Sequence, residues 1–96
     1  IMKNNLTLAI CMYNAEKYVK ETLQCLFDQT KQDFKLLIVD DCSTDNSVEI
    51  VKTFFNEHPR QYEIVNLKVN RGLCAGRKFV EDYAKTKYLL FVEVKL

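Results

Sequence analysis

Two adjacent carboxylates follow a short apolar run in the middle of this chain. Residues 36–39 read Leu-Leu-Ile-Val, and Asp40 and Asp41 come directly after them. Such a run is typical of a buried strand, and open parallel α/β sheets bind ligands beyond the carboxyl ends of their strands. One acid could simply cap a following helix. Successive strand side chains point to opposite faces, however, so we do not expect both acids to be caps.

Two other residues could complete a polar site with this acid pair. Tyr13 follows an apolar run at residues 6–12, and Arg77 lies in an amphipathic segment over residues 73–84. A nucleobase can stack on a tyrosine ring, a carboxylate can accept its N–H, and an arginine can neutralise phosphate oxygens. The combination predicts a pocket for a mononucleotide diphosphate. The alternatives are that Tyr13 is a core residue and Arg77 a solvated helix residue.

The elements that must position these residues alternate along the chain. Asn14 is the expected N-cap of the first helix, and residues 70–72 are an expected turn. Strand-helix alternation predicts an α/β fold with four mainly parallel strands, helices on both faces and the order βαβαβαβ. Hydrophobic patterning predicts strands over 6–12, 34–39, 62–67 and 88–94, and helices over 15–29, from 43–47 to about 58, and over 73–84.

Length and composition limit the class of protein. Residues 1–96 make a single domain, and a net charge of +1 with mixed acids and bases is not that of a nucleic-acid-binding protein. No apolar run approaches the roughly 18 residues of a membrane span, and no secretory signal peptide is evident. The four cysteines are widely spaced, which disfavours a zinc site and indicates reduced thiols. We therefore expect a cytoplasmic chain, with a parent protein that could lie at the cytoplasmic face of the membrane.

Several nucleotide-binding classes do not fit the first strand-to-helix turn. Residues 11–16 contain no glycine, so the Gly-x-Gly-x-x-Gly turn of dinucleotide-binding domains is absent, as is the Walker pattern. A receiver domain would need its acid pair after the first strand and another acid after the third. Gly72 and Gly76 are weak evidence for a site, because such glycines more often serve packing.

Four segments in order closely resemble the front half of family 2 inverting glycosyltransferases. The longest matching stretch is Ile-Val-Asp-Asp-Cys-Ser-Thr-Asp-Asn-Ser at residues 38–47, and another is Asn-Arg-Gly-Leu-Cys-Ala-Gly-Arg at residues 70–77. The remaining two are residues 10–18 and 29–34, so the resemblance runs through essentially the whole chain. It implies the N-terminal, nucleotide-sugar-binding half of a Rossmann-like GT-A domain.

The resemblance also implies roles for individual residues. The ligand would be a nucleotide-diphosphate sugar, often a UDP-sugar. Asp41 would contact the base, while Asp40 would help to order the turn. The other nucleotide-binding residues implied are Cys11, Tyr13 and Asn14 beside the base and ribose, and Arg77 facing the nucleotide.

The chain departs from the family at the end of the fourth strand. The family has an Asp-x-Asp there that holds Mn²⁺ or Mg²⁺ against the diphosphate, whereas this chain has Glu93 and Lys95 at those two positions. Glu93 could be a metal ligand, but a lysine ammonium cannot. We expect an altered motif or a chain truncated at its C-terminus, with the general base beyond Leu96 and metal binding by this piece in doubt. The piece alone is then not expected to transfer sugar.

Two functional hypotheses therefore remain, together with one structural expectation. The first is the donor-binding part of an inverting glycosyltransferase, and the second is a non-catalytic nucleotide-binding or assembly module that has lost the metal motif. An uncovered fourth strand would offer unpaired backbone groups to another chain. We therefore expect a homodimer through that strand or through an exposed helix face.

Overall fold

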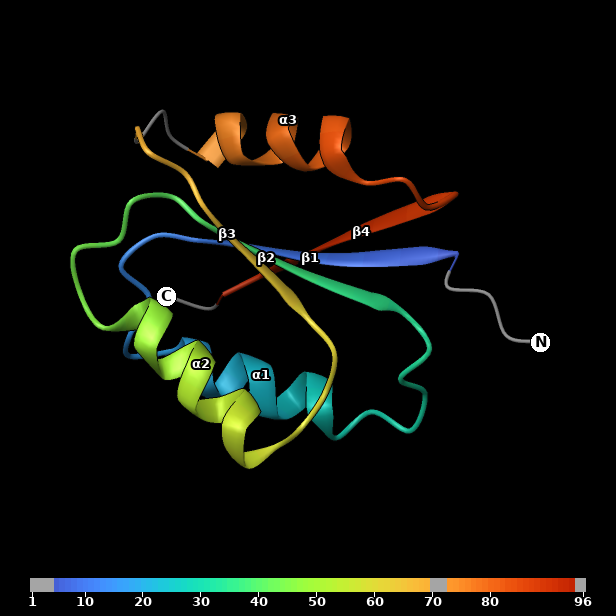
Figure 1. The fold of residues 1–96 in the computed structure, drawn as a ribbon, viewed down its shortest axis with the longest axis horizontal. Coiled ribbons are helices and arrows are strands. Elements are labelled where there is room, and N and C mark those ends of the chain that lie inside the picture. The colour runs from blue at the N-terminus through green and yellow to red at the C-terminus, as the bar shows by residue number, and fades with distance from the viewer. Residues whose placement is uncertain (1–4, 70–72, 95–96) are drawn as a thin grey trace.

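The computed structural model of the protein describes residues 5–69 and 73–94. The expected turn at residues 70–72 and Lys95 lie outside the described residues. Strands and helices alternate, and the chain runs from β1 to β4 in the predicted βαβαβαβ order (Figure 1). The elements are β1 (Leu6–Met12), α1 (Val19–Phe27), β2 (Lys35–Asp40), α2 (Ser47–Glu57), β3 (Glu63–Asn66), α3 (Leu73–Tyr83) and β4 (Tyr88–Glu93).

The four strands form one parallel sheet in the order β3-β2-β1-β4. Helices α1 and α2 cover one face of this sheet, and α3 covers the other (Figure 1). A parallel sheet needs a crossover between consecutive strands, and helical crossovers bury both of its faces. The predicted α/β fold with helices on both faces is thus confirmed.

Each face of the sheet has its own core. The α1/α2 side is the larger, with Ile10, Val19, Leu23, Ile38 and Phe54 all almost completely buried. The α3 side is smaller, and among the described residues its core includes Val80 of α3, with Phe79 partly buried against it. Val80 packs with three strand residues, Ala9, Leu37 and Val39. The strands β1 and β2 are buried on both faces, which explains why their sequences are nearly continuous apolar runs.

The first helix begins later than its sequence pattern predicts. Helix α1 starts at Val19 rather than at residue 15, and its N-cap residue is Tyr18, which makes no side-chain capping bond. Asn14 is not an N-cap, so that prediction was wrong. Its backbone has φ = 47°, in the left-handed region that asparagine tolerates better than most residues. Hydrogen bonds to the β2–α2 connection hold residues 14–16 and so keep them out of the helix.

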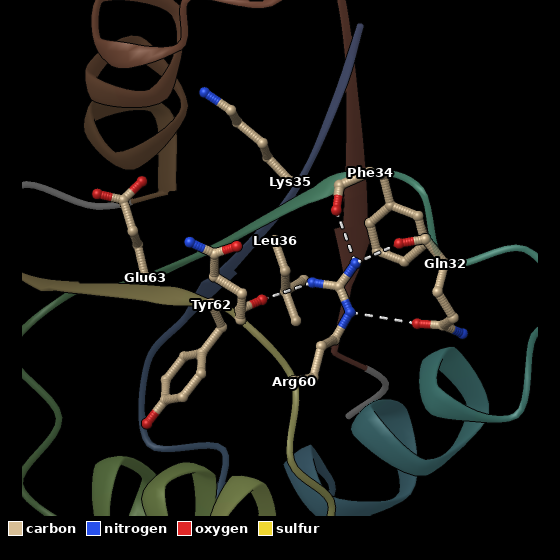
Figure 2. Close-up of a pocket in the computed structure, with 8 residues that line it drawn as sticks. Gln32, Phe34, Lys35, Leu36, Arg60, Tyr62 and Glu63 are labelled. Atoms are coloured by element: carbon tan, nitrogen blue, oxygen red, sulfur yellow. Dashed lines mark hydrogen bonds between the residues drawn. The ribbon is translucent and has the colours of Figure 1, made fainter. Parts of the chain in front are cut away.

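Arg60 ties two loops together at the edge of the sheet where the strands begin (Figure 2). Its guanidinium donates to the carbonyl oxygens of Gln32 at 2.8 Å, Phe34 at 2.6 Å and Gln61 at 2.7 Å. It also donates to the side-chain oxygen of Gln32 at 3.2 Å and lies 4.4 Å from the centre of the Phe34 ring. With these donors engaged by the chain itself, Arg60 is a structural clamp. Arg60 lines a pocket together with Phe34 and Lys35, at the end of the strands opposite Asp41 (Figure 2).

Candidate functional site

The carboxyl ends of β1, β2 and β4 bring several of the predicted site residues to one edge of the sheet. In the parallel register Cys11 of β1 lies beside Glu93 of β4, and Met12 lies beside Asp40 of β2. Asp41 continues from β2, and its N–H donates to the Met12 carbonyl at 2.9 Å. The edge predicted from the apolar runs therefore carries acidic groups from two strands.

The two adjacent acids have different surroundings, although both are buried. Asp40 accepts hydrogen bonds on both carboxylate oxygens, from the Ser43 N–H at 3.0 Å and from the Ser43 hydroxyl at 2.5 Å. Its carboxylate is thus committed to the turn that follows β2. Asp41 differs, because its Oδ1 is buried and accepts no hydrogen bond from any described residue.

An unpartnered carboxylate oxygen is unfavourable inside a protein. Burying a polar atom without a hydrogen bond costs about 1–3 kcal/mol, and more where the group is charged. Most buried polar atoms are paired, so an exception needs an explanation, such as strain or a bound water, ion or ligand. A ligand that donates an N–H or O–H to Asp41 would remove the penalty. Of the two acids, Asp41 is the one whose carboxylate keeps an unused acceptor.

Cys11 lies between the charged groups of this edge and is half-buried. Burial raises the pKa of its thiol, the positive charge of Arg77 acts against that rise, and the negative charge of Asp41 adds to it. A raised pKa keeps the sulfur protonated at neutral pH, so Cys11 is a lining group and not a nucleophile. A Cβ placed on Gly76 would lie 3.5 Å from the Cys11 sulfur, which brings α3 directly over β1 at the site.

Arg77 and Glu93 face each other from α3 and β4. A guanidinium nitrogen of Arg77 lies 3.7 Å from Oε1 of Glu93, and the guanidinium carbon lies 4.7 Å from the centre of the Phe91 ring. The Arg77 side chain is 37% exposed and that of Glu93 71%. An ion pair this open to solvent adds little to stability. Its effect is to hold the positively charged guanidinium of Arg77 near the carboxyl end of β4.

Tyr13 and Asn14 lie on the adjoining β1–α1 connection. Tyr13 is 49% exposed, so the alternative that it is a core tyrosine is wrong. Oδ1 of Asn14 accepts the Thr44 N–H at 2.8 Å, and the Asn14 N–H donates to the Ser43 hydroxyl at 2.8 Å. Asn14 therefore links two turns and has less freedom to meet a ligand than Tyr13.

Five residues that sequence reasoning gave no site role complete this link. The Ala15 N–H donates to the Ser47 hydroxyl at 2.8 Å, and the Glu16 N–H donates to Asp45 at 3.2 Å. In return, the Asn46 N–H donates to the Glu16 carboxylate at 3.0 Å. We call these bonds, with those of Asn14, the turn clasp. Its residues after β2 belong to the predicted helix start and to the stretch that resembles the family, but a Ser/Thr/Asp cluster is equally suited to binding backbone N–H groups.

The donor set does not match a metal centre. Across residues 5–69 and 73–94 no three side chains of His, Cys, Asp or Glu are grouped closely enough to hold a metal ion. Glu93 stands where the family resemblance places a ligand, but its carboxylate faces a guanidinium. The prediction that Glu93 binds a metal has no test here and stays a prediction.

None of the helices within residues 5–69 and 73–94 has the length and apolar character needed to cross a membrane.

Comparison with known proteins gives a consistent family. Residues 7–93 match the model of "Glycosyl transferase family 2". A teichoic acid poly(glycerol phosphate) polymerase of Staphylococcus epidermidis is 31% identical over 90 residues, which is 94% of this chain and 12% of that protein. The chain thus spans about an eighth of that relative's length.

Solved structures agree with the fold. Residues 1–349 of TarS from S. aureus, solved in complex with UDP-GlcNAc, match with a TM-score of 0.83 at 30% identity, covering 94% of this chain and 26% of that one. A mannosyltransferase from Pyrobaculum calidifontis, solved with GDP-Man and Mn²⁺, matches with a TM-score of 0.86 at 19% identity, covering 94% and 27%. The second likeness bears on the fold alone. Together they support the predicted GT-A architecture for the part of the domain that this chain covers.

Proposed function

We propose that this chain, which belongs to glycosyl transferase family 2, binds the nucleotide of a UDP-sugar at the sheet edge that carries Asp41. The observation that carries the proposal is the buried, unpartnered Oδ1 of Asp41. The imide N–H of uracil is a donor of the kind that this oxygen lacks, and a carboxylate accepts it with a charge-assisted bond. The UDP-GlcNAc complex of TarS, a relative at 30% identity, supports the choice of a uridine nucleotide.

The neighbouring residues suit the rest of the nucleoside. Tyr13 offers an exposed aromatic ring beside the base, and Cys11 offers a neutral thiol that carries no charge into the pocket. Asp40 and Asn14 position the site, because their hydrogen bonds to Ser43 and Thr44 hold the turns from which Asp41 and Tyr13 project. Asp41, Tyr13 and Cys11 would thus contact the nucleoside directly, and Asp40 and Asn14 would position them.

Sugar transfer itself is proposed for a longer protein. In an inverting transferase a carboxylate base removes the proton of the acceptor hydroxyl while the nucleotide diphosphate leaves from the opposite side of the anomeric carbon. We expect that base beyond Leu96, and we expect no transfer by these 96 residues alone. A cytoplasmic location also stays a prediction.

The test is a UDP titration of this chain by calorimetry. Asp41→Asn keeps the size of the side chain but removes its charge, and we expect it to weaken UDP binding at least about tenfold, the equivalent of 1.4 kcal/mol. Asp33→Asn, at an exposed acid before β2, is the matched control and should bind as the wild type does. Equal UDP affinity in wild type and Asp41→Asn would contradict the proposal, as would preference for GDP.

The second candidate is a non-catalytic nucleotide-binding or assembly module. The observation in its favour is the Arg77–Glu93 pair at the place where the family resemblance puts a metal motif. The two candidates differ in the longer protein: a transferase would consume a UDP-sugar and release UDP, whereas a module would bind it unchanged. Measuring UDP release by the full-length protein decides between them.

A further inference from the structure

We infer that Arg77, held in place by Glu93 and Phe91, supplies the positive charge for the diphosphate of the bound nucleotide in place of a divalent cation. The chain would then bind a nucleoside diphosphate without metal. This inference rests on the proposed nucleotide site and adds to it the way in which that site meets the charged end of its ligand.

The first step is the poor fit of a metal ion to the residues present. Mg²⁺ and Mn²⁺ prefer several oxygen ligands, usually from one or two carboxylates besides the phosphates and water. Among the described residues the end of β4 offers one carboxylate, Glu93, and its Oε1 lies 3.7 Å from the Arg77 guanidinium. A divalent ion bound to Glu93 would therefore sit next to a fixed positive charge, which opposes its binding.

The second step is the state of the Arg77 side chain. The guanidinium lies over the Phe91 ring and 3.7 Å from Oε1 of Glu93, and both contacts restrict its orientation before a ligand arrives. Yet the side chain remains 37% exposed, which leaves N–H donors open to solvent. A guanidinium presents its donors in a planar fork that matches phosphate oxygens, and a pre-oriented one loses less conformational entropy on binding.

The third step is that Arg77 belongs to the same site as Asp41. Cys11 lies near both Arg77 and Asp41, since the charge of each acts on the pKa of its thiol. Helix α3 approaches β1 at Gly76, one residue before Arg77. A nucleotide whose base meets Asp41 would therefore have its diphosphate on the side of Cys11 where Arg77 lies. In this arrangement Glu93 is a positioning residue for Arg77.

The experiment compares uridine with UDP, because only UDP carries the diphosphate. Both are titrated into ¹⁵N-labelled protein and followed by NMR, which also measures weak binding, once with EDTA and once with Mg²⁺ at constant ionic strength. In EDTA we expect UDP to bind about tenfold or more tightly than uridine, the size of a charge-assisted contact. Mg²⁺ should give no further gain.

Three variants separate the roles of the two charged residues. Arg77→Gln should lose the advantage of UDP over uridine while uridine binds as before, which also shows that the variant is folded. Lys78→Gln is the matched control, since Lys78 is an exposed neighbour on α3 that pairs with Asp82, and it should keep the advantage. Glu93→Gln should leave UDP affinity within about threefold and still independent of Mg²⁺, because a positioning contact is worth less than the phosphate contact itself.

Other results of these titrations would contradict the inference, the proposed function or both. If the advantage of UDP over uridine needs Mg²⁺ and disappears in Glu93→Gln, then Glu93 is a metal ligand and the inference is wrong. If uridine binds and UDP binds no better in EDTA, the inference fails while the proposed base site stands. If neither ligand binds, the proposed function fails, and this inference fails with it.

Discussion

The backbone N–H of Ala15 donates a 2.8 Å hydrogen bond to the buried hydroxyl of Ser47, which joins the β1–α1 connection to the first turn of α2. The same hydroxyl donates to Asp45. Ser47 thus holds together the two turns from which Tyr13 and Asp41 reach the proposed nucleotide site.

Removing this hydroxyl should destabilise the fold. Ser47→Ala leaves the buried Ala15 N–H without an acceptor, and we expect the free energy of unfolding to fall by about 1–3 kcal/mol. Urea denaturation followed by circular dichroism measures the change. Thr53→Ala, at an exposed position of the same helix, is the control and should stay within about 0.5 kcal/mol of wild type. An equal effect of the two substitutions would argue against a structural role for the turn clasp.

Acid should weaken the turn clasp through Asp45. Desolvation alone would raise the pKa of this carboxyl, but hydrogen bonds from Ser47 and from the Glu16 N–H outweigh it and hold the pKa below its ordinary 3.8. A lowered pKa in the folded state means that the stabilisation is present above about pH 3.8 and is lost as the pH falls through the folded value. Thermal melts at pH 6 and pH 3 should therefore differ less in Asp45→Asn than in wild type. Asp33→Asn should keep the wild-type difference, and the same loss in all three proteins would exclude Asp45 as its source.

The Arg60 clamp should matter for stability and not for nucleotide binding. Arg60→Lys cannot reproduce the planar fork that reaches the carbonyls of Gln32, Phe34 and Gln61. We expect a loss of about 1–3 kcal/mol in the free energy of unfolding, with UDP affinity unchanged. Urea denaturation and the calorimetric titration test the two parts. Lys35→Gln, an exposed residue of the same pocket, should change neither, whereas weaker UDP binding in Arg60→Lys would mean that the two edges of the sheet are coupled.

Gly76 should tolerate alanine. A Cβ at this position would meet the Cys11 sulfur and Cβ at 3.5 and 3.7 Å, which are ordinary van der Waals distances. Glycine inside a helix is less favourable than alanine by about 0.5–1 kcal/mol. Gly76→Ala should therefore raise the midpoint of urea unfolding. A lowered midpoint would show that α3 needs to approach β1 more closely than these distances indicate.

Strand β4 forms one edge of the described sheet, and the predicted homodimer would use it. Leu90 is 51% exposed beside this edge, where backbone groups have no neighbouring strand. We expect light scattering to show a dimer that forms as protein concentration rises. Leu90→Lys should shift the protein toward monomer, because a charge on an edge strand opposes pairing. A wild-type protein that stays monomeric at high concentration would rule this prediction out.

Local pattern in the sequence was enough to predict the order of the elements and much of the site edge. The apolar run at residues 6–12 became β1 with the predicted bounds, and Asp40 and Asp41 lie where a buried strand ends. These features depend on neighbouring residues: a strand buried on both faces must be apolar, and a helix must repeat its apolar residues every three or four positions. Even the end of α2 at Glu57, with His58 as its C-cap, follows from the proline after His58.

Contacts between residues far apart in the sequence determine the features of the fold and of the site that local pattern does not predict. Asn14 has the residue type of a helix cap, but bonds to Ser43 and Thr44 place it in a left-handed turn and delay α1 to Val19. Residue type and spacing alone do not distinguish Asp40 from Asp41, and only the family resemblance gave them different roles. In the folded turn Asp40 accepts two hydrogen bonds from Ser43, whereas Oδ1 of Asp41 has no partner among the described residues. The pairing of Arg77 with Glu93 likewise exists only once α3 packs over β4. All three features depend on which groups the fold brings within hydrogen-bonding or Coulombic range. Residue type and spacing in the sequence do not determine the distance between such groups.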